Sequence, residues 1–320
     1  MFPRFEAWNS MTKNGDNIVI VTHPSPDGDA LGSAFALAQA LDIAGKKPVV
    51  LLDTFSEKFN FLKGQEYIYT GNISSLPCDV FIAVDCGEKS RMGGAEELFN
   101  RTAITINIDH HINNKNFARF NYIDPNCSST CEVIFNIVSM YIPISRDIAE
   151  ALYTGIVTDT GGFRHASCSA ETMEITAMLM RVGIDIGDIH RRTIHAHSKT
   201  ETAIFAAALQ SRQYLDGYPI AYAAITQADL KAAGAVYTDL DGIAEYLLNT
   251  NGITAAALFT QRGDGKTKVS MRSVGINVSE IAGKLGGGGH KFAAACVLES
   301  GLEEVVPQVL AELKAATGKS

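Results

Sequence analysis

The chain has 320 residues, 46% of them hydrophobic, and a formal net charge of −8. This length and apolar content predict one large or two medium globular domains with packed cores. The negative charge argues against a long track for a nucleic-acid backbone, which needs clustered Lys and Arg. It leaves open a short anionic substrate held by a few Arg residues and metal ions.

No uninterrupted apolar run is long enough to cross a bilayer, and the first residues lack the apolar region of a secretory signal. We therefore expect a cytoplasmic protein without a membrane partner. The six cysteines form no C-x-x-C pair, which argues against zinc-ribbon and thioredoxin chemistry. Reduced, mostly buried thiols are expected instead.

The first half of the chain alternates strands with helices. After a short entry helix at residues 2–14, apolar runs predict strands at 18–21, 48–52, 79–84 and 103–108. Helical patterns follow at 30–44, 129–141, 146–158, 170–182 and 186–193. This alternation predicts an α/β fold with a parallel sheet that carries helices on both faces.

The pattern changes near residue 190. We expect residues 1–190 to form the first domain, residues 191–199 a linker, and residues 200–320 a smaller α/β domain. In the second domain, helices are predicted at 201–213, 228–233, 240–249, 279–285 and 302–316, and strands at 220–225, 253–261 and 267–272. Asp264-Gly265 between the last two strands is typical of a hairpin turn.

Potential metal ligands follow three of the predicted strands. These residues are His23, Asp27, Asp29, Asp85, Asp109, His110 and His111. Because the carboxyl ends of parallel strands meet at one edge of a sheet, where ligands bind in open α/β folds, we expect them to converge. Asp159 adds a carboxylate in a glycine-rich stretch. Taken alone, Asp27 and Asp29 are equally consistent with turn and N-cap residues.

So many carboxylates at one edge would repel one another unless a cation lay among them. Oxygen ligands with one or two imidazoles suit Mn²⁺, with Mg²⁺, Co²⁺ or Fe²⁺ as alternatives. The ligands outnumber those that one ion needs. The sequence therefore predicts two divalent metal ions bridged by a carboxylate, an arrangement that serves phosphoester hydrolysis.

In this order, the motifs resemble those of the DHH phosphoesterase family. The chain is similar to the branch that joins a DHH domain to a smaller DHH-associated domain, and the resemblance covers nearly the whole chain. The matching motifs are His23-x-x-x-Asp27-x-Asp29, Asp85, Asp109-His110-His111, Asp159 and Gly287-Gly288-Gly289-His290.

The resemblance implies a role for each matching residue. The metal ligands would be His23, Asp27, Asp29, Asp85, His110 and Asp159. Asp85 would lie between the two ions, Asp109 would orient His110, and His111 would face the substrate phosphate. Asp85, Asp109 and His111 would thus form the catalytic set. In the second domain, Arg272, His290 and the three glycines would bind the substrate.

Physical reasoning supports a binding role for the glycine run. Successive glycines can turn their N–H groups inward as an anion-binding nest, although a flexible loop is the alternative. Gly286 precedes the motif and leaves open which amides form the cradle. Arg164, close to Asp159, is equally consistent with a substrate contact and a surface ion pair. Ser128, Ser129 and Thr130 predict a helix N-cap, or hydroxyls that face phosphate.

Within the family, the chain is most similar to members that degrade short oligonucleotides to mononucleotides. Removal of the 3′-phosphate of 3′-phosphoadenosine 5′-phosphate is also implied. The alternatives are a phosphodiesterase for linear dinucleotides derived from cyclic ones, an inorganic pyrophosphatase or exopolyphosphatase, and a non-catalytic nucleotide- or RNA-binding regulator. Nucleotides and short oligonucleotides are thus the expected partners, and the resemblance also allows a homodimer.

Overall fold

The computed structural model describes residues 4–318 and divides the chain into two compact units. The first unit ends at Ala196 and the second begins at His197. The predicted linker at 191–199 is mostly helical, because α7 (Ile186–His190) continues into a π-helical turn, η5 (Arg191–His195), and α8 begins at Lys199. Within this polar, basic stretch, Ile194 packs against the core of the first unit, to which Ile189 of α7 also belongs.

The first unit is built on a five-stranded sheet in the order β2-β1-β3-β4-β5, and every pairing is parallel. The strands are β1 (Asn17–Val21), β2 (Lys47–Leu51), β3 (Val80–Val84), β4 (Ile104–Asp109) and β5 (Phe120–Ile123). The four predicted strands are confirmed to within one residue at each end. The edge strand β5 was not predicted, because it is short and only Tyr122 in it is buried.

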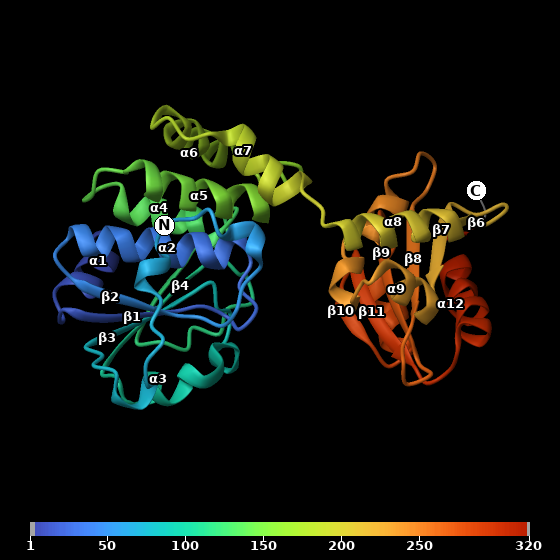
Figure 1. Ribbon diagram of the computed structural model, residues 1–320, viewed down its shortest axis with the longest axis horizontal. Helices are drawn as coiled ribbons and strands as arrows, with labels where there is room; N and C mark the ends of the chain where they lie inside the picture. Colours follow the sequence, from blue (N-terminus) through green and yellow to red (C-terminus); the bar gives the residue numbers. More distant parts are fainter. Residues whose placement is uncertain (1–3, 319–320) are drawn as a thin grey trace. The chain divides into compact units, whose positions relative to one another are not determined.

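Helices cover both faces of this sheet, as predicted (Figure 1). One face carries α1 (Arg4–Thr12), α2 (Gly28–Ile43), α4 (Thr130–Val138) and α5 (Arg146–Asp159). The other carries η4 (Lys89–Ala95) and α3 (Glu96–Arg101). Ile18 and Ile20 of β1 join the first core, and Val19 and Val21 the second, as the alternation of a strand requires. Helix α6 (Ala170–Arg181) packs on α5.

The second unit contains a six-stranded sheet in the order β10-β11-β9-β8-β7-β6. Its strands are β6 (Gln213–Tyr214), β7 (Ile220–Ile225), β8 (Ala255–Gln261), β9 (Thr267–Ser273), β10 (Gly288–His290) and β11 (Ala293–Leu298). Only β7 and β8 pair in parallel. The predicted hairpin between β8 and β9 is confirmed. Strands β10 and β11 were not predicted, because glycines and alanines give them a weak strand pattern.

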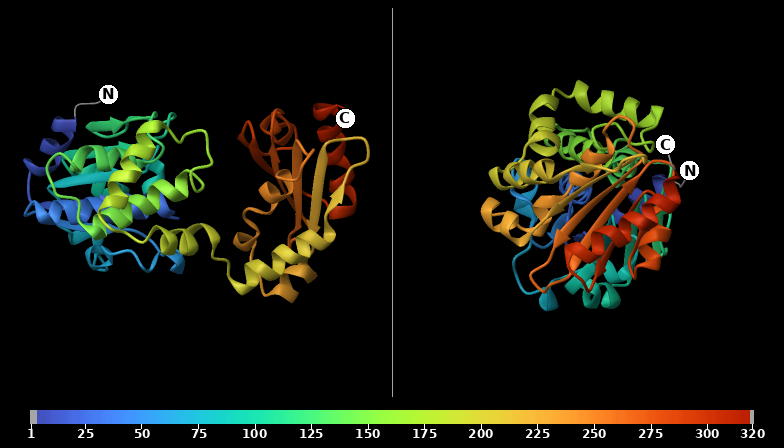
Figure 2. Two further views of the ribbon diagram at one scale, coloured as in Figure 1. Left: turned by 90° about the horizontal axis from the view of Figure 1, so that it is seen from above. Right: turned by 90° about the vertical axis from the view of Figure 1, so that its right-hand side faces the viewer.

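Both faces of the second sheet are also covered. On one face lie α11 (Val278–Lys284) and α12 (Leu302–Thr317), the latter drawn in red in Figure 2. On the other lie α8 (Lys199–Ser211), α9 (Gln227–Ala233) and α10 (Ile243–Leu248). All six cysteines are free thiols, as predicted. Within residues 4–318, no helix combines the length and apolarity needed to span a membrane.

Candidate active site

Three neighbouring strands bring the predicted site residues to one edge of the first sheet. β1, β3 and β4 run parallel to one another, so their carboxyl ends meet there. His23 lies two residues beyond β1, Asp85 directly follows β3, and Asp109 ends β4. The chain reverses its direction across the sheet between β1 and β3, which is where open α/β sheets bind ligands.

Within residues 4–318, acidic and imidazole side chains form three overlapping groups at this edge. In each group the potential ligand atoms all lie within 4.8 Å of one another. The groups are Asp85, Asp109, His110 and His111; His23, Asp27 and Asp85; and Asp29, His110 and Asp159. They include every residue predicted to bind metal. Because Asp85 and His110 each belong to two groups, the cluster is continuous.

Asp85 lies at the centre of the cluster and is only 3% exposed. Its carboxylate is 3.6 Å from His23 Nε2, 3.6 Å from His111 Nδ1 and 4.0 Å from His110 Nε2. The Thr130 hydroxyl donates a 3.0 Å hydrogen bond to it. The backbone φ of 55° is in the left-handed region, which Asp and Asn adopt more readily than other non-glycine residues. Asp and Asn therefore suit this position.

The start of α2 supplies two carboxylates with different surroundings. Asp27 is the N-cap of α2, and its Oδ1 accepts hydrogen bonds from the amides of Asp29 and Ala30. Asp29 is buried and accepts hydrogen bonds from the amides of Thr130 (2.7 Å) and Cys131 (2.9 Å), in the first turn of α4. Asp27 is thus both the predicted N-cap of α2 and a member of the cluster. Asp29 does not cap α2, because it lies within the first turn of that helix.

Asp109 orients His111, whereas the sequence predicted that it would orient His110. The buried Asp109 carboxylate is 2.7 Å from His111 Nδ1 and accepts hydrogen bonds from Asn114 and from the His110 amide. Burial alone would raise the pKa of Asp109, but these hydrogen bonds hold it below its ordinary value. The Asp109 hydrogen bond in turn raises the pKa of His111 to about 9. His111 therefore carries a proton at neutral pH in the metal-free protein.

His110 and Asp159 meet on another side of the cluster. His110 Nε2 is 3.5 Å from Asp159 Oδ2, and its Nδ1 is 3.4 Å from the Cys127 carbonyl oxygen, which occupies the place that Asp109 was predicted to take. Asp159 is the last residue of α5 and does not follow the helix as predicted. Burial is the main cause that raises the pKa of Asp159 to about 6.

The charges of the cluster fit bound cations. Burial, with the nearby charges of Asp85 and Asp159, raises the pKa of Asp29 well above its ordinary value. In the described part of the chain, the ion-pair partners of Asp85 and Asp159 are histidines, never Lys or Arg. Buried like charges without a cationic partner are costly. A divalent ion among these oxygen and nitrogen ligands would offset the repulsion.

The glycine run of the second unit forms a strand and not the predicted nest. The amides of Gly286 and Gly287 donate to carbonyls of α11, so they are not free to bind an anion. Gly288 and Gly289 belong to β10. A Cβ on Gly287 would lie 2.2 Å from the Ala295 carbonyl oxygen, and one on Gly289 would lie 2.5 Å from that of Ala293. These two glycines are thus required by the close approach of β11.

Arg272 and His290 lie in one row across the second sheet. Ala293 of β11 pairs with His290 of β10 on one side and with Arg272 of β9 on the other. Because cross-strand partners share a face, the two basic side chains flank a small alanine on the same face. Arg164 of the first unit donates to the Gly161 carbonyl oxygen at 2.6 Å. No ion pair of Arg164 occurs within residues 4–318, so the predicted surface ion pair is not observed, and the predicted substrate contact stays a prediction.

Two contributors to the site were missed by sequence reasoning. Ser129 is the N-cap of α4, as predicted, but Thr130 directs its hydroxyl to Asp85. Asn114 donates to Asp109 and to Asn107, and so fixes the Asp109 carboxylate. Asn114 gave no signal beyond its place in a polar loop after Asp109.

Two protein-family models match the chain. The model of the DHH family N-terminal domain matches residues 17–156, and the model of the DHHA1 domain matches residues 217–319. The chain thus contains a DHH family N-terminal domain and a DHHA1 domain. The two DHH-type matches contain Arg272, His290 and every residue of the cluster except Asp159, which lies three residues beyond the first match.

Curated relatives and a solved structure resemble this DHH chain over most of its length. The bifunctional oligoribonuclease and PAP phosphatase NrnA of Thermus thermophilus is 29% identical, over 92% of this chain and 88% of the relative. The cyclic-di-AMP phosphodiesterase PdeA of Listeria monocytogenes is 26% identical, over 92% of this chain but 46% of the relative. An exopolyphosphatase-related protein from Bacteroides fragilis is 27% identical with a TM-score of 0.88, covering 98% of this chain and 96% of that one.

Proposed function

We propose that this chain is a divalent-metal-dependent phosphoesterase. Its substrates are short oligonucleotides, which it hydrolyses to mononucleotides, and 3′-phosphoadenosine 5′-phosphate, from which it removes the 3′-phosphate. The observation that carries the proposal is the continuous cluster of carboxylates and imidazoles around Asp85. The name of the NrnA relative supports this choice of substrates.

In this proposal, six residues hold two divalent ions, with Mn²⁺ favoured and Mg²⁺ or Co²⁺ as alternatives. These are His23, Asp27, Asp29, Asp85, His110 and Asp159. Asp85 would be the carboxylate that both ions share, because it is the one carboxylate that belongs to two of the three groups. When bound, the ions supply Lewis-acid chemistry that acidifies water and neutralises charge on the phosphoryl oxygens.

His111 binds the substrate phosphate directly. Its Nδ1 is held by Asp109, which leaves Nε2 free to donate to a non-bridging oxygen of the phosphate. Its side chain is 43% exposed, compared with 4% for Asp85, so it is accessible to a substrate. Asp109 and Asn114 fix the ring and act as positioning residues. Charge-assisted hydrogen bonds of this kind are among the strongest that a side chain makes to phosphate.

Arg272 and His290 bind the part of the substrate away from the scissile phosphate, and the glycines at 287–289 shape the strand that carries His290. The two basic side chains flank Ala293, and this spacing suits one phosphate or a nucleotide between them. Gly287 and Gly289 contribute by letting β11 approach, and Gly288 lies between them in an exposed strand. Arg164, five residues after Asp159 in the sequence, adds a further basic side chain on the first unit.

We expect Arg272→Ala to raise the KM for a trinucleotide about tenfold, because one charge-assisted contact to phosphate is lost. The metal content should stay unchanged. Lys268→Ala is the matched control, since Lys268 lies four residues earlier on the same face of β9. An unchanged KM for the Arg272 variant would remove this residue from the binding site.

The experiment that tests the proposed function is a substrate panel at fixed Mn²⁺. It contains short RNA, short DNA, 3′-phosphoadenosine 5′-phosphate, linear dinucleotides and inorganic pyrophosphate. We expect turnover of the oligonucleotides and of the nucleotide phosphate. Turnover of linear dinucleotides alone would favour a second candidate, which the similarity to the cyclic-di-AMP phosphodiesterase supports. Binding without turnover would indicate a non-catalytic regulator. The presence of all six proposed metal-ligating residues argues against that function.

A further inference from the structure

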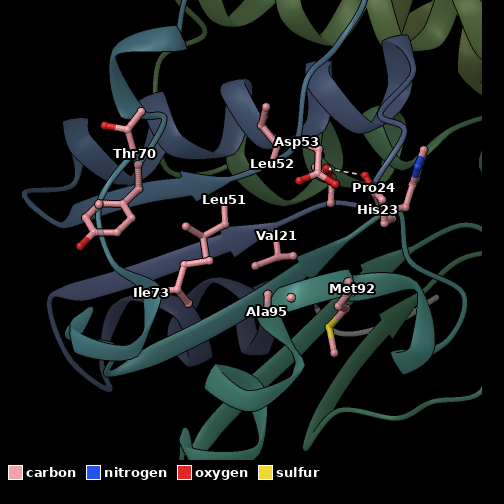
Figure 3. Close-up of a pocket in the computed structure, with 15 residues that line it drawn as sticks. Val21, His23, Pro24, Leu51, Leu52, Asp53, Thr70, Ile73, Met92 and Ala95 are labelled. Atoms are coloured by element: carbon pink, nitrogen blue, oxygen red, sulfur yellow. Dashed lines mark hydrogen bonds between the residues drawn. The ribbon is translucent and has the colours of Figure 1, made fainter.

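A cavity of about 200 Å³ opens beside the metal-ligand cluster, at the carboxyl ends of β1 and β2 (Figure 3). Its apolar wall includes Val21, Leu51, Ile73, Met92 and Ala95. Drug-sized ligands occupy pockets of roughly 300–1,000 Å³, so this cavity suits a smaller group such as a single nucleoside. The switch point of the sheet, where ligands bind in open α/β folds, lies between β1 and β3, and the cavity adjoins it through His23 and Met92.

Asp53 gives this cavity a polar side that favours a neutral hydrogen-bond donor over a phosphate. It lies two residues beyond β2 and is the one carboxylate among the described residues that line the cavity. It is exposed, and within residues 4–318 its carboxylate makes no ion pair or hydrogen bond. Neither Lys nor Arg lines the cavity in that part of the chain. A carboxylate can only accept hydrogen bonds, so it favours a neutral group with a donor and disfavours a phosphate.

His23 connects the cavity to the proposed reaction site. It lines the cavity and also belongs to the group that contains Asp27 and Asp85. In Figure 3, Asp53 lies between His23 and Thr70. A nucleotide whose phosphate lies at the metal-ligand cluster would therefore present its sugar near Asp53 and its base to the apolar wall. In every nucleoside of an oligonucleotide except the 3′-terminal one, the O3′ atom is esterified, which leaves the 2′-hydroxyl as the sugar's donor.

We propose that this cavity binds one nucleoside of the substrate and that Asp53 accepts a hydrogen bond from the ribose 2′-hydroxyl. The chain then selects RNA over DNA, because this hydroxyl is the group that distinguishes them. An acidic side chain performs the same task in dinucleotide-binding α/β folds, where it binds the ribose 2′-hydroxyl near the switch point. This inference rests on the proposed function, since it assigns the sugar specificity of that site.

The test compares Asp53→Ala with the wild-type protein loaded with Mn²⁺. The first readout is kcat/KM for a 5′-phosphorylated RNA dinucleotide and for its 2′-deoxy counterpart. We expect the variant to lose about tenfold or more with RNA, the effect of one hydrogen bond to a charged group, and less than about twofold with DNA. Glu57→Ala is the matched control, because it removes an exposed carboxylate four residues away that does not line the cavity.

The second readout is independent of turnover and uses calorimetric binding of AMP and 2′-deoxy-AMP. We expect the wild-type protein to bind AMP more tightly, and Asp53→Ala to abolish that difference. Thr70→Trp, at an exposed position of the cavity wall, should weaken both ligands alike because it fills the space for the base. If Thr70→Trp binds both ligands as tightly as the wild type, the cavity is not the nucleoside site.

The outcomes separate this inference from the proposed function. If Asp53→Ala changes kcat/KM for RNA and DNA equally, or changes neither, the role of Asp53 is overturned. The proposed phosphoesterase function is then unaffected. A wild-type protein that hydrolyses neither dinucleotide but prefers AMP through Asp53 overturns the proposed hydrolysis of oligonucleotides and supports the nucleoside site.

Discussion

Asp85→Asn should lower kcat for short oligonucleotides by at least about a thousandfold and leave the protein folded. Asp85 lies within 4.0 Å of three imidazoles and belongs to two of the three ligand groups, so its charge is the one that two ions would share. An amide of the same shape ligates weakly and does not neutralise the ions. Steady-state hydrolysis of an RNA dinucleotide at saturating Mn²⁺ measures the loss.

The fold should tolerate this change for two reasons. Asn adopts the left-handed backbone of residue 85 readily, and its carbonyl oxygen can still accept the hydrogen bond from Thr130. One charge fewer among Asp29, Asp85 and Asp159 also reduces their mutual repulsion, which offsets the lost attraction between Asp85 and the protonated His111. Asp147→Asn, at an exposed site on α5, is the control. Turnover within tenfold of the wild type would exclude Asp85 as the bridging ligand.

Gly155→Ala should destabilise the first unit by about 1–3 kcal/mol, as overpacking of a well-packed core does. Gly155 lies in α5, where a Cβ would be 2.1 Å from Cys131 Sγ and 2.8 Å from Asp29 Oδ1. Denaturant unfolding followed by circular dichroism measures the change. Since the clash displaces Asp29, the affinity for Mn²⁺ should fall as well.

Two further variants make this prediction specific. Gly187→Ala places a methyl group in α7 with only an ordinary contact to Asp185, so it should leave stability unchanged or raise it by up to about 1 kcal/mol. Adding Cys131→Ala to Gly155→Ala removes the sulfur atom that clashes, and should restore part of the stability. A Gly155 variant as stable as the wild type would mean that α2, α4 and α5 can separate without cost.

The sequence was sufficient to predict those parts of the site that follow from the topology of the sheet. Strand ends of a parallel sheet must share an edge, so His23, Asp85 and Asp109 could be brought together without coordinates. The sequence could not predict which imidazole Asp109 would contact, because His110 and His111 are adjacent and only the path of the loop decides which ring faces the carboxylate. The hydrogen bond from Thr130 to Asp85 could not be predicted either, because the two residues are 45 positions apart and only the fold brings them together.

The second unit was predicted less well, because small residues carry its key geometry. Ala293–Leu298 forms β11 with only two buried side chains, Ala294 and Cys296, so its apolar alternation is weak. Because β11 was not predicted, the glycine run was interpreted as an anion-binding loop. With β11 in place, Gly287 and Gly289 serve a close backbone contact, and the basic pair of Arg272 and His290 becomes the chemical feature of this face.

The central claim is that the cluster around Asp85 binds divalent metal, and metal analysis of active protein tests it most directly. Protein equilibrated with Mn²⁺ and freed of unbound ions should contain about two metal ions per chain by mass spectrometry, as a two-metal site requires. The Asp85→Asn variant should contain fewer, and Asp147→Asn as many as the wild type. Wild-type protein that hydrolyses its substrate with no divalent metal bound would contradict the claim.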